Sequence, residues 1–110
     1  YDFPATAEQL MRSRYSAYCL NDLTYLNETS LTPHESMNAD ISWITLDVIH
    51  VTHGKRDDSA GTVEFNALFK QDHHYYILHE KSTFKRVANQ WRYVNGDSRI
   101  IPHQSPYIYD

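Results

Sequence analysis

Two charged residues stand where the surrounding pattern is apolar, and charged groups in such places often do chemistry. Glu80 shares the apolar side of an alternating segment with Leu78 and Ser82, and Arg14 lies in the middle of an apolar helical stripe. A charge removed from water needs an opposite charge or several hydrogen bonds. We therefore expect Arg14 and Glu80 to make a direct, largely buried contact.

This charge pair has two interpretations. In the first it is a structural tether between a helix and a sheet, as many ion pairs are. In the second it belongs to the polar floor of a pocket, in which Glu80 or Asp97 could act as a general base on a small molecule. The predicted pocket residues are Arg14, Tyr18, Phe65, Glu80, Ser82, Tyr93 and Asn95.

The other reactive side chains predict neither a metal site nor a nucleophile. The chain has seven histidines, but His73 and His79 lie about 20 Å apart along one predicted strand, and there is no cysteine pair. We therefore expect no bound metal, and we place His79 on the outer face of the sheet. Cys19 is the single cysteine, which excludes an internal disulfide, fits a reducing compartment and predicts a buried spectator.

Composition limits the kinds of partner. A length of 110 residues predicts one domain, and the net charge of −4 argues against nucleic acid and anionic membranes as partners. No apolar run approaches the roughly 20 residues of a membrane helix. The chain begins at Tyr1 without a secretory signal pattern. We expect an excerpt or processed product of a soluble, cytoplasmic protein.

The candidate residues must be positioned by helices that come first in the chain. Thr6 and Gln9 match a capping box, and the apolar period that follows predicts a helix over residues 7–20. Asp22 can cap a second, shorter helix that ends near residue 30. A helical turn at residues 35–39 is a further possibility.

Strands follow the helices. Alternation predicts strands at about residues 42–51, 62–70, 75–87 and 91–95, joined as an antiparallel meander. Helices before a meander predict an α+β fold with the helices on one face of the sheet. Residues 1–99 would form the domain, and residues 100–110, in which two prolines break regular structure, would form a docked tail.

Two-residue hairpin loops fix the register of the last three strands. A loop at Asp72 and His73 pairs Phe65 with Glu80, and one at Ala88 and Asn89 pairs Phe84 with Tyr93. The second loop also predicts Ser82 opposite Asn95 and Glu80 opposite Asp97. All these residues would then share the inner face.

Four blocks of the sequence resemble the middle domain of YchJ-like proteins, the SEC-C motif family. They are residues 5–18 (ATAEQLMRSRYSAY), 61–65 (GTVEF), 78–84 (LHEKSTF) and 91–97 (WRYVNGD). The resemblance spans about residues 5–97. It implies a nuclear-transport-factor-2-like, cystatin-like cone, with helices packed on the concave face of a curved four-stranded sheet around a conical pocket.

The resemblance implies a bacterial accessory domain but no particular reaction. Its Cys-Pro-Cys-Gly-Ser motif, thought to bind zinc, is absent here, so no cofactor is expected within this segment. We expect a non-catalytic domain that binds a small ligand in its pocket. The alternatives are a lyase- or isomerase-type enzyme that uses a pocket carboxylate, and a partner-binding module that forms a homodimer through its tail or an exposed sheet surface.

Overall fold

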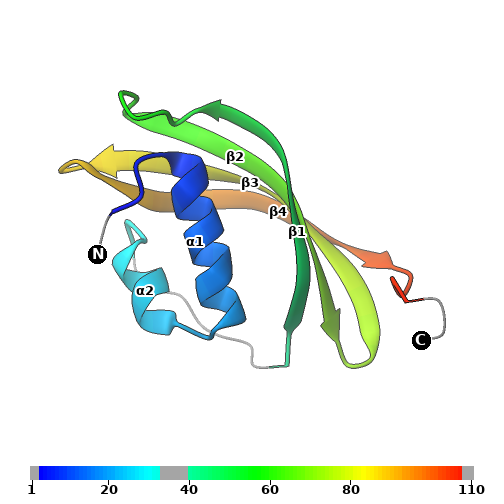
Figure 1. Ribbon diagram of the computed structural model, residues 1–110. Helices are drawn as coiled ribbons and strands as arrows, with labels where there is room; N and C mark the ends of the chain where they lie inside the picture. The colour runs from blue at the N-terminus through cyan, green and yellow to red at the C-terminus, as the bar shows by residue number, and fades with distance from the viewer. Residues whose placement is uncertain (1–2, 33–39, 108–110) are drawn as a thin grey trace.

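The computed structural model describes residues 3–32 and 40–107, and it confirms the α+β fold (Figure 1). Two helices precede a four-stranded antiparallel sheet of order β1-β2-β3-β4. The elements are α1 (Ala7–Cys19), α2 (Leu23–Glu28), β1 (Ser42–His53), β2 (Ala60–Gln71), β3 (His74–Val87) and β4 (Gln90–His103). The helical turn expected at residues 35–39 lies outside the described residues. No helix in the described ranges is long and apolar enough to cross a membrane.

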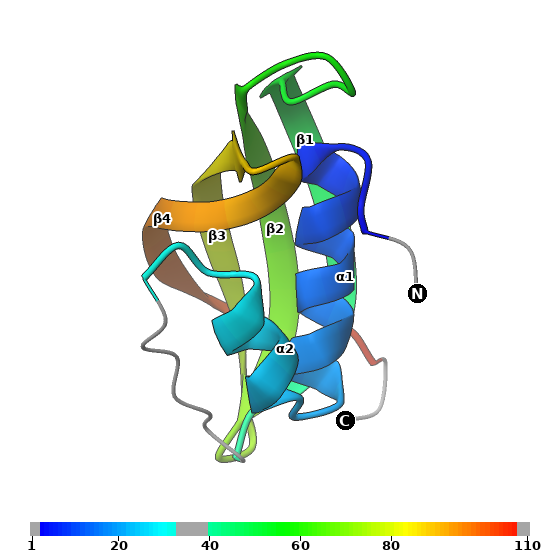
Figure 2. The ribbon, with the colours of Figure 1, turned by 90° about the vertical axis from the view of Figure 1, so that its left-hand side faces the viewer.

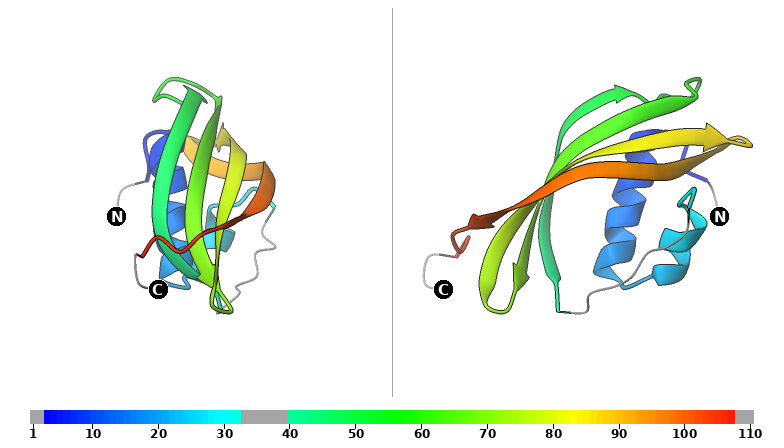
Figure 3. Two further views of the ribbon diagram at one scale, coloured as in Figure 1. Left: turned by 90° about the vertical axis from the view of Figure 1, so that its right-hand side faces the viewer. Right: turned by 180° about the vertical axis from the view of Figure 1, so that it is seen from behind.

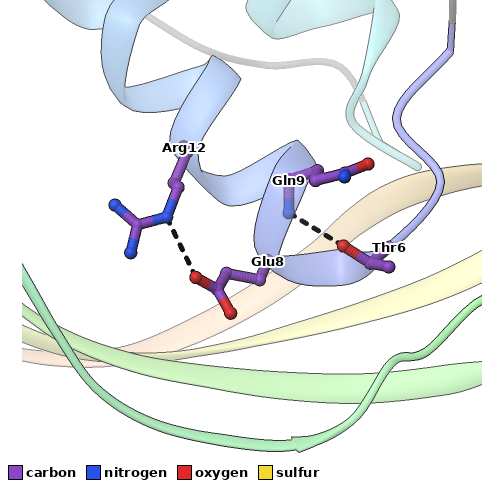
Figure 4. Close-up of polar contacts among 4 residues, drawn as sticks. All are labelled: Thr6, Glu8, Gln9 and Arg12. Carbon is purple, nitrogen blue, oxygen red and sulfur yellow. Dashed lines mark hydrogen bonds and ion pairs between the residues drawn. The ribbon is translucent and has the colours of Figure 1, made fainter.

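Both helices begin where the capping residues predict. The Gln9 backbone N–H donates to Thr6 Oγ1 at 3.1 Å (Figure 4), and the Tyr25 N–H donates to Asp22 Oδ1 at 3.0 Å. The Gln9 side chain accepts from the N–H of Ala5 at 2.8 Å, one residue before the cap. Side-chain caps satisfy N–H groups that the first helical turn leaves unpaired, and so they fix where each helix starts.

The sheet curves around the helices, and α1 and α2 both lie on its concave side (Figure 2). The predicted inner face is confirmed, because Val63, Phe65 and Ala67 of β2 are buried against Leu10 and Met11 of α1. Burying these apolar side chains is the main source of stability for such a two-layer fold. The packing places α1 against β1, β2 and β4.

The predicted register is confirmed for β2 with β3, including Phe65 opposite Glu80. For β3 with β4 it is confirmed at Phe84 opposite Tyr93 but is wrong beyond that pair. The register shifts there, so that Asn95 lies opposite Thr83 and Asp97 lies opposite Lys81. A β-bulge adds one residue to one strand, and a one-residue slip moves every later side chain to the other face. Asn95 and Asp97 therefore lie on the outer, convex face.

The last strand is longer than predicted. We expected irregular structure from residue 100, but β4 continues through Pro102 to His103. A proline, which lacks an N–H, is tolerated in an edge strand because one side of that strand has no neighbour to bond. Beyond β4 the ring of Tyr107 contacts that of Tyr75, with centroids 6.3 Å apart. The domain boundary at residue 99 stays a prediction.

Candidate functional site

A cavity of about 250 Å³ lies between α1 and the concave face of the sheet. Its lining comes from α1 and all four strands: Met11, Arg14, Tyr15, Tyr18, Trp43, Phe65, Ala67, Leu78, Glu80, Ser82, Phe84 and Tyr93. Six of the seven predicted pocket residues are in this lining, and Asn95 is not. The curvature of the sheet and the position of α1 over it bring these side chains together.

One wall of the cavity is aromatic and centres on Trp43. Its ring lies 6.0 Å from that of Tyr15, 6.1 Å from Tyr18 and 5.1 Å from Phe69, measured between centroids. Sequence reasoning missed Trp43 because a register irregularity after it breaks the alternation of β1, so that Trp43 shares a face with Leu46, three residues on. Tyr15 lies within the helix predicted over residues 7–20 and next to Arg14 in the sequence, and this position could have included it.

The carboxylate of Glu80 is held by one of its two oxygens. Oε2 accepts a hydrogen bond from Ser82 Oγ at 2.5 Å and a longer one from the Tyr93 hydroxyl at 3.5 Å. Oε1 has no hydrogen-bond partner among the described residues. Gly96 provides the room, since a Cβ atom there would lie 2.4 Å from Oε2. Glu80 is thus a positioned carboxylate with one oxygen left to accept a further hydrogen bond.

Arg14 is buried as predicted, but its predicted contact with Glu80 is wrong. Its Nη1 donates to Leu26 O at 2.9 Å, Thr29 Oγ1 at 2.7 Å and Ser30 Oγ at 3.1 Å. No ion pair joins Arg14 to Glu80 in the part of the chain that the structure describes. The end of α2 offers a carbonyl and two hydroxyls with partial negative charge, and these stabilise the guanidinium. Arg14 therefore ties α1 to α2.

Tyr93 lies between the two charged residues. The guanidinium carbon of Arg14 is 4.5 Å from the centroid of the Tyr93 ring, while the Tyr93 hydroxyl donates to Glu80. A cation over an aromatic face is attracted by the ring's quadrupole, more strongly where water is excluded. One tyrosine from β4 thus connects the helical wall of the cavity with its carboxylate.

Tyr15 is a hydrogen-bond donor at neutral pH. Burial, together with charge repulsion and a hydrogen bond from the neighbouring Cys19, raises the pKa of Tyr15 to about 12. Cys19 itself is exposed, so the prediction that it is buried is wrong. At roughly 100° per residue, Cys19 lies about 120° around the axis of α1 from the buried Ala7. This position is outside the buried stripe of the helix.

The remaining candidates lie away from the cavity. His79 is on the outer face as predicted, where its Nε2 contacts Glu64 Oε2 at 2.7 Å. Asp97 is exposed on the same convex face, so the register removes it as a general base within the cavity. Within residues 3–32 and 40–107, no group of three or more His, Cys, Asp or Glu side chains is placed to hold a metal ion.

Comparisons with protein sequences agree with the blocks of similarity noted above. A family model described as the middle NTF2-like domain of YchJ matches residues 6–96. A UPF0225 protein of Ralstonia nicotianae is 43% identical over 110 residues, which covers 86% of this chain and 75% of that protein. A UPF0225 protein of Cupriavidus metallidurans is 40% identical over 106 residues, with 87% and 74% covered.

Two solved structures have the same fold. The solution structure of a SEC-C motif containing protein from Rhodopseudomonas palustris matches with a TM-score of 0.70 at 28% identity, covering 84% of this chain and 78% of that one. The crystal structure of a SEC-C motif containing protein from Psychrobacter arcticus matches with a TM-score of 0.70 at 32% identity, covering 86% and 62%.

Proposed function

Since the chain belongs to the YchJ-like family, as its middle NTF2-like domain, we propose that it binds a small molecule in the cavity beneath α1. The ligand that fits has an apolar or aromatic body and one group that donates a hydrogen bond. The excess of acidic residues, with a net charge of −4, supports a small molecule rather than nucleic acid as the partner. No catalytic step is part of this proposal.

The size of the cavity supports a ligand of about one ring. Its volume of about 250 Å³ exceeds the ~150 Å³ of an apolar cavity known to take up benzene. It is slightly below the roughly 300–1,000 Å³ of sites for drug-sized ligands. A single-ring molecule with a short polar substituent fits between these limits.

The carboxylate of Glu80 is the observation that carries the proposal. Its Oε2 is fixed by Ser82 and Tyr93, and Oε1 accepts no hydrogen bond from the described residues. A partly desolvated carboxylate gains most from a donor that carries positive charge, because charge-assisted hydrogen bonds are about twice as strong as neutral ones. Ammonium ligands are therefore favoured, neutral alcohols and amides bind less tightly, and carboxylates are repelled.

The experiment uses three probes that differ in one group: benzylamine, benzyl alcohol and benzoate. Titration into the ¹⁵N-labelled domain should shift the Trp43 indole resonance, with affinity falling in that order. Glu80→Gln should weaken the binding of benzylamine by about tenfold or more, which is the contribution of a hydrogen bond to a charged group. Glu64→Gln, which removes a carboxylate from the outer face, should change nothing. Equal affinity for all three probes, or equal effects of the two variants, would contradict the proposal.

General-base catalysis is a second candidate function, supported by the same fixed carboxylate. A base must reach the proton it removes, and an anchored Glu80 with one unengaged oxygen meets this geometric need. A proton-abstracting site would exchange an acidic C–H of a bound small ketone with deuterium from D₂O. Phenylacetone is a suitable probe. If its C–H groups exchange with deuterium faster in the presence of the protein than in buffer alone, and if Glu80→Gln abolishes this acceleration, the domain is an enzyme. Exchange at the buffer rate would leave binding as the function.

A further inference from the structure

The outer edge of β4 is covered in its first part only. There the Tyr93 N–H donates to Thr29 O, and the Leu31 N–H donates to Tyr93 O, both at 2.8 Å. Along residues 95–101 no described segment pairs with this edge, and these residues have no further hydrogen bonds. Seen from behind, this part of β4 runs past the end of the helices and forms the border of the sheet (Figure 3).

An open strand edge of this kind is a template for another strand. Two large apolar side chains accompany it, since Ile100 is 60% exposed on the concave side and Ile101 is 42% exposed on the convex side. Natural proteins usually protect such an edge with charges, a bulge or a proline. Here Pro102 and the bulge before Asn95 limit the open stretch at its two ends, and the seven residues between them contain two charged side chains, Asp97 and Arg99, which are of opposite sign.

We propose that a second copy of this chain pairs with the open edge of β4, antiparallel, about a two-fold axis at Ser98. The two sheets of four strands then form one continuous sheet. A two-fold axis perpendicular to the sheet keeps both concave faces on one side, and it makes the same patch serve both copies. Residues 95–101 of one copy face residues 101–95 of the other.

Charge selects this register among its neighbours. With the axis at Ser98, Asp97 of each copy lies directly opposite Arg99 of the other, and both side chains are on the convex face. Moving the axis to Asp97 or to Arg99 sets two like charges opposite each other, which destabilises an antiparallel pair. Moving it to Ile100 brings Pro102 into the ladder, where its missing N–H costs a hydrogen bond. Only the Ser98 register forms two opposite-charge pairs.

The same register suits the side chains on the concave face. Ile100 of the second copy lies across from Gly96, which has no side chain to obstruct it. Gly96 also adjoins Glu80 of the cavity, because a Cβ atom at Gly96 would lie 2.4 Å from Glu80 Oε2. The exposed ion pairs themselves add little stability, whereas like charges directly opposite each other destabilise the pairing of two strands, so the charges decide which register forms. Burial of the isoleucines and the backbone hydrogen bonds would supply the affinity.

A charge-swap experiment on the full chain tests this interface by sedimentation velocity. The wild-type chain should dimerise with rising concentration, whereas Asp97→Arg and Arg99→Asp alone should each be monomeric over the same range. A mixture of the two variants should recover a dimer, because each supplies the charges that the other needs. Asp47→Arg, which changes an exposed aspartate on the far strand β1, is the control and should dimerise like the wild type. Circular dichroism should show that each variant is folded.

Three results would overturn the proposal. They are a wild-type chain that stays monomeric at every concentration, a dimer that both single variants retain, and single variants that remain monomeric when mixed. None of these depends on ligand binding, so the interface and the cavity are tested independently.

Discussion

Gly96→Ala is the substitution whose effect follows most directly from the geometry of the cavity. A methyl group at this position would lie 2.4 Å from Glu80 Oε2 and 2.8 Å from the Tyr93 hydroxyl, both well inside contact distance. The carboxylate must therefore move, and it then gives up its hydrogen bond from Ser82 Oγ. Because Ser82 is 2% exposed, its hydroxyl is left without an acceptor in a place that water reaches poorly.

The magnitude comes from three contributions. Loss of a hydrogen bond to a charged group costs roughly 1.5–3 kcal/mol, and Glu80 recovers part of this because it is only half-buried and can turn to water. Replacing glycine by alanine within a strand returns about 0.5–1 kcal/mol of backbone entropy. We expect Gly96→Ala to lower the free energy of unfolding by about 1–2 kcal/mol. In the Glu80→Ala background only the Tyr93 hydroxyl stays close, at 2.8 Å, and this end of a side chain can shift, so the same change should have an effect within about 0.5 kcal/mol.

The assay is urea unfolding followed by tryptophan fluorescence for the four members of this double-mutant cycle. The coupling free energy between Gly96 and Glu80 should be about 2 kcal/mol. Any effect of Gly96→Ala that does not involve Glu80 is the same in the wild-type and Glu80→Ala backgrounds, and so it cancels. Ser98→Ala is the matched control, because it changes an exposed residue opposite Glu80 and should have an effect within about 0.5 kcal/mol. An equal loss from Gly96→Ala in both backgrounds would refute the position assigned to the carboxylate.

Three further predictions follow from the rest of the site. Arg14→Met should lower the free energy of unfolding by about 2–4 kcal/mol, because it removes three hydrogen bonds and a buried cation–π contact. Arg12→Met is the control on the same helix, because Arg12 forms an exposed pair with Glu8 (Figure 4), and it should lower the free energy of unfolding by under ~0.5 kcal/mol. If urea unfolding gave similar losses for the two variants, the role of Arg14 would be contradicted. Because the pKa of Tyr15 rises from 10 to about 12 on folding, the unfolded chain releases this proton first, so stability should fall as pH rises through that window. Between pH 9 and pH 11 the free energy of unfolding, measured with urea, should fall less for Tyr15→Phe than for the wild type. An equal fall in both proteins would contradict burial of the phenol. EDTA should leave the melting temperature unchanged, since the described residues contain no metal-ligating group of three; a clear drop would reveal a bound metal.

Most of the fold could be predicted because two local signals agree. The capping residues Thr6 and Asp22 mark where the helices start, and period-two alternation between two-residue loops fixes the inner face of β2 and β3. The loops Asp72-His73 and Ala88-Asn89 have positive φ angles at both positions, as tight hairpins between twisted strands require. Where strand, loop and strand are all regular, register follows from counting residues.

The errors at the site arise where counting fails. A bulge leaves no clear mark in the sequence. The register shift after Tyr93 places Asn95 and Asp97 on the convex face. The register shift after Trp43 is the reason that the centre of the aromatic wall was not predicted. The partner of Arg14 was missed for a different reason. A sequence shows which charges exist, but the acceptors at the end of α2 are a backbone carbonyl and two hydroxyls, brought to Arg14 only by tertiary packing.

The most direct test of the cavity as a ligand site is the position of a bound probe in solution. Intermolecular nuclear Overhauser effects between benzylamine and the ¹³C-labelled domain report which side chains touch it. We predict contacts from its ring protons to Trp43 and Leu78, and from its methylene protons to Ser82 beside the Glu80 carboxylate. Contacts confined to the exposed side chains of Ile100 and Ile101, with none to the cavity lining, would contradict the claim that this cavity binds a small molecule.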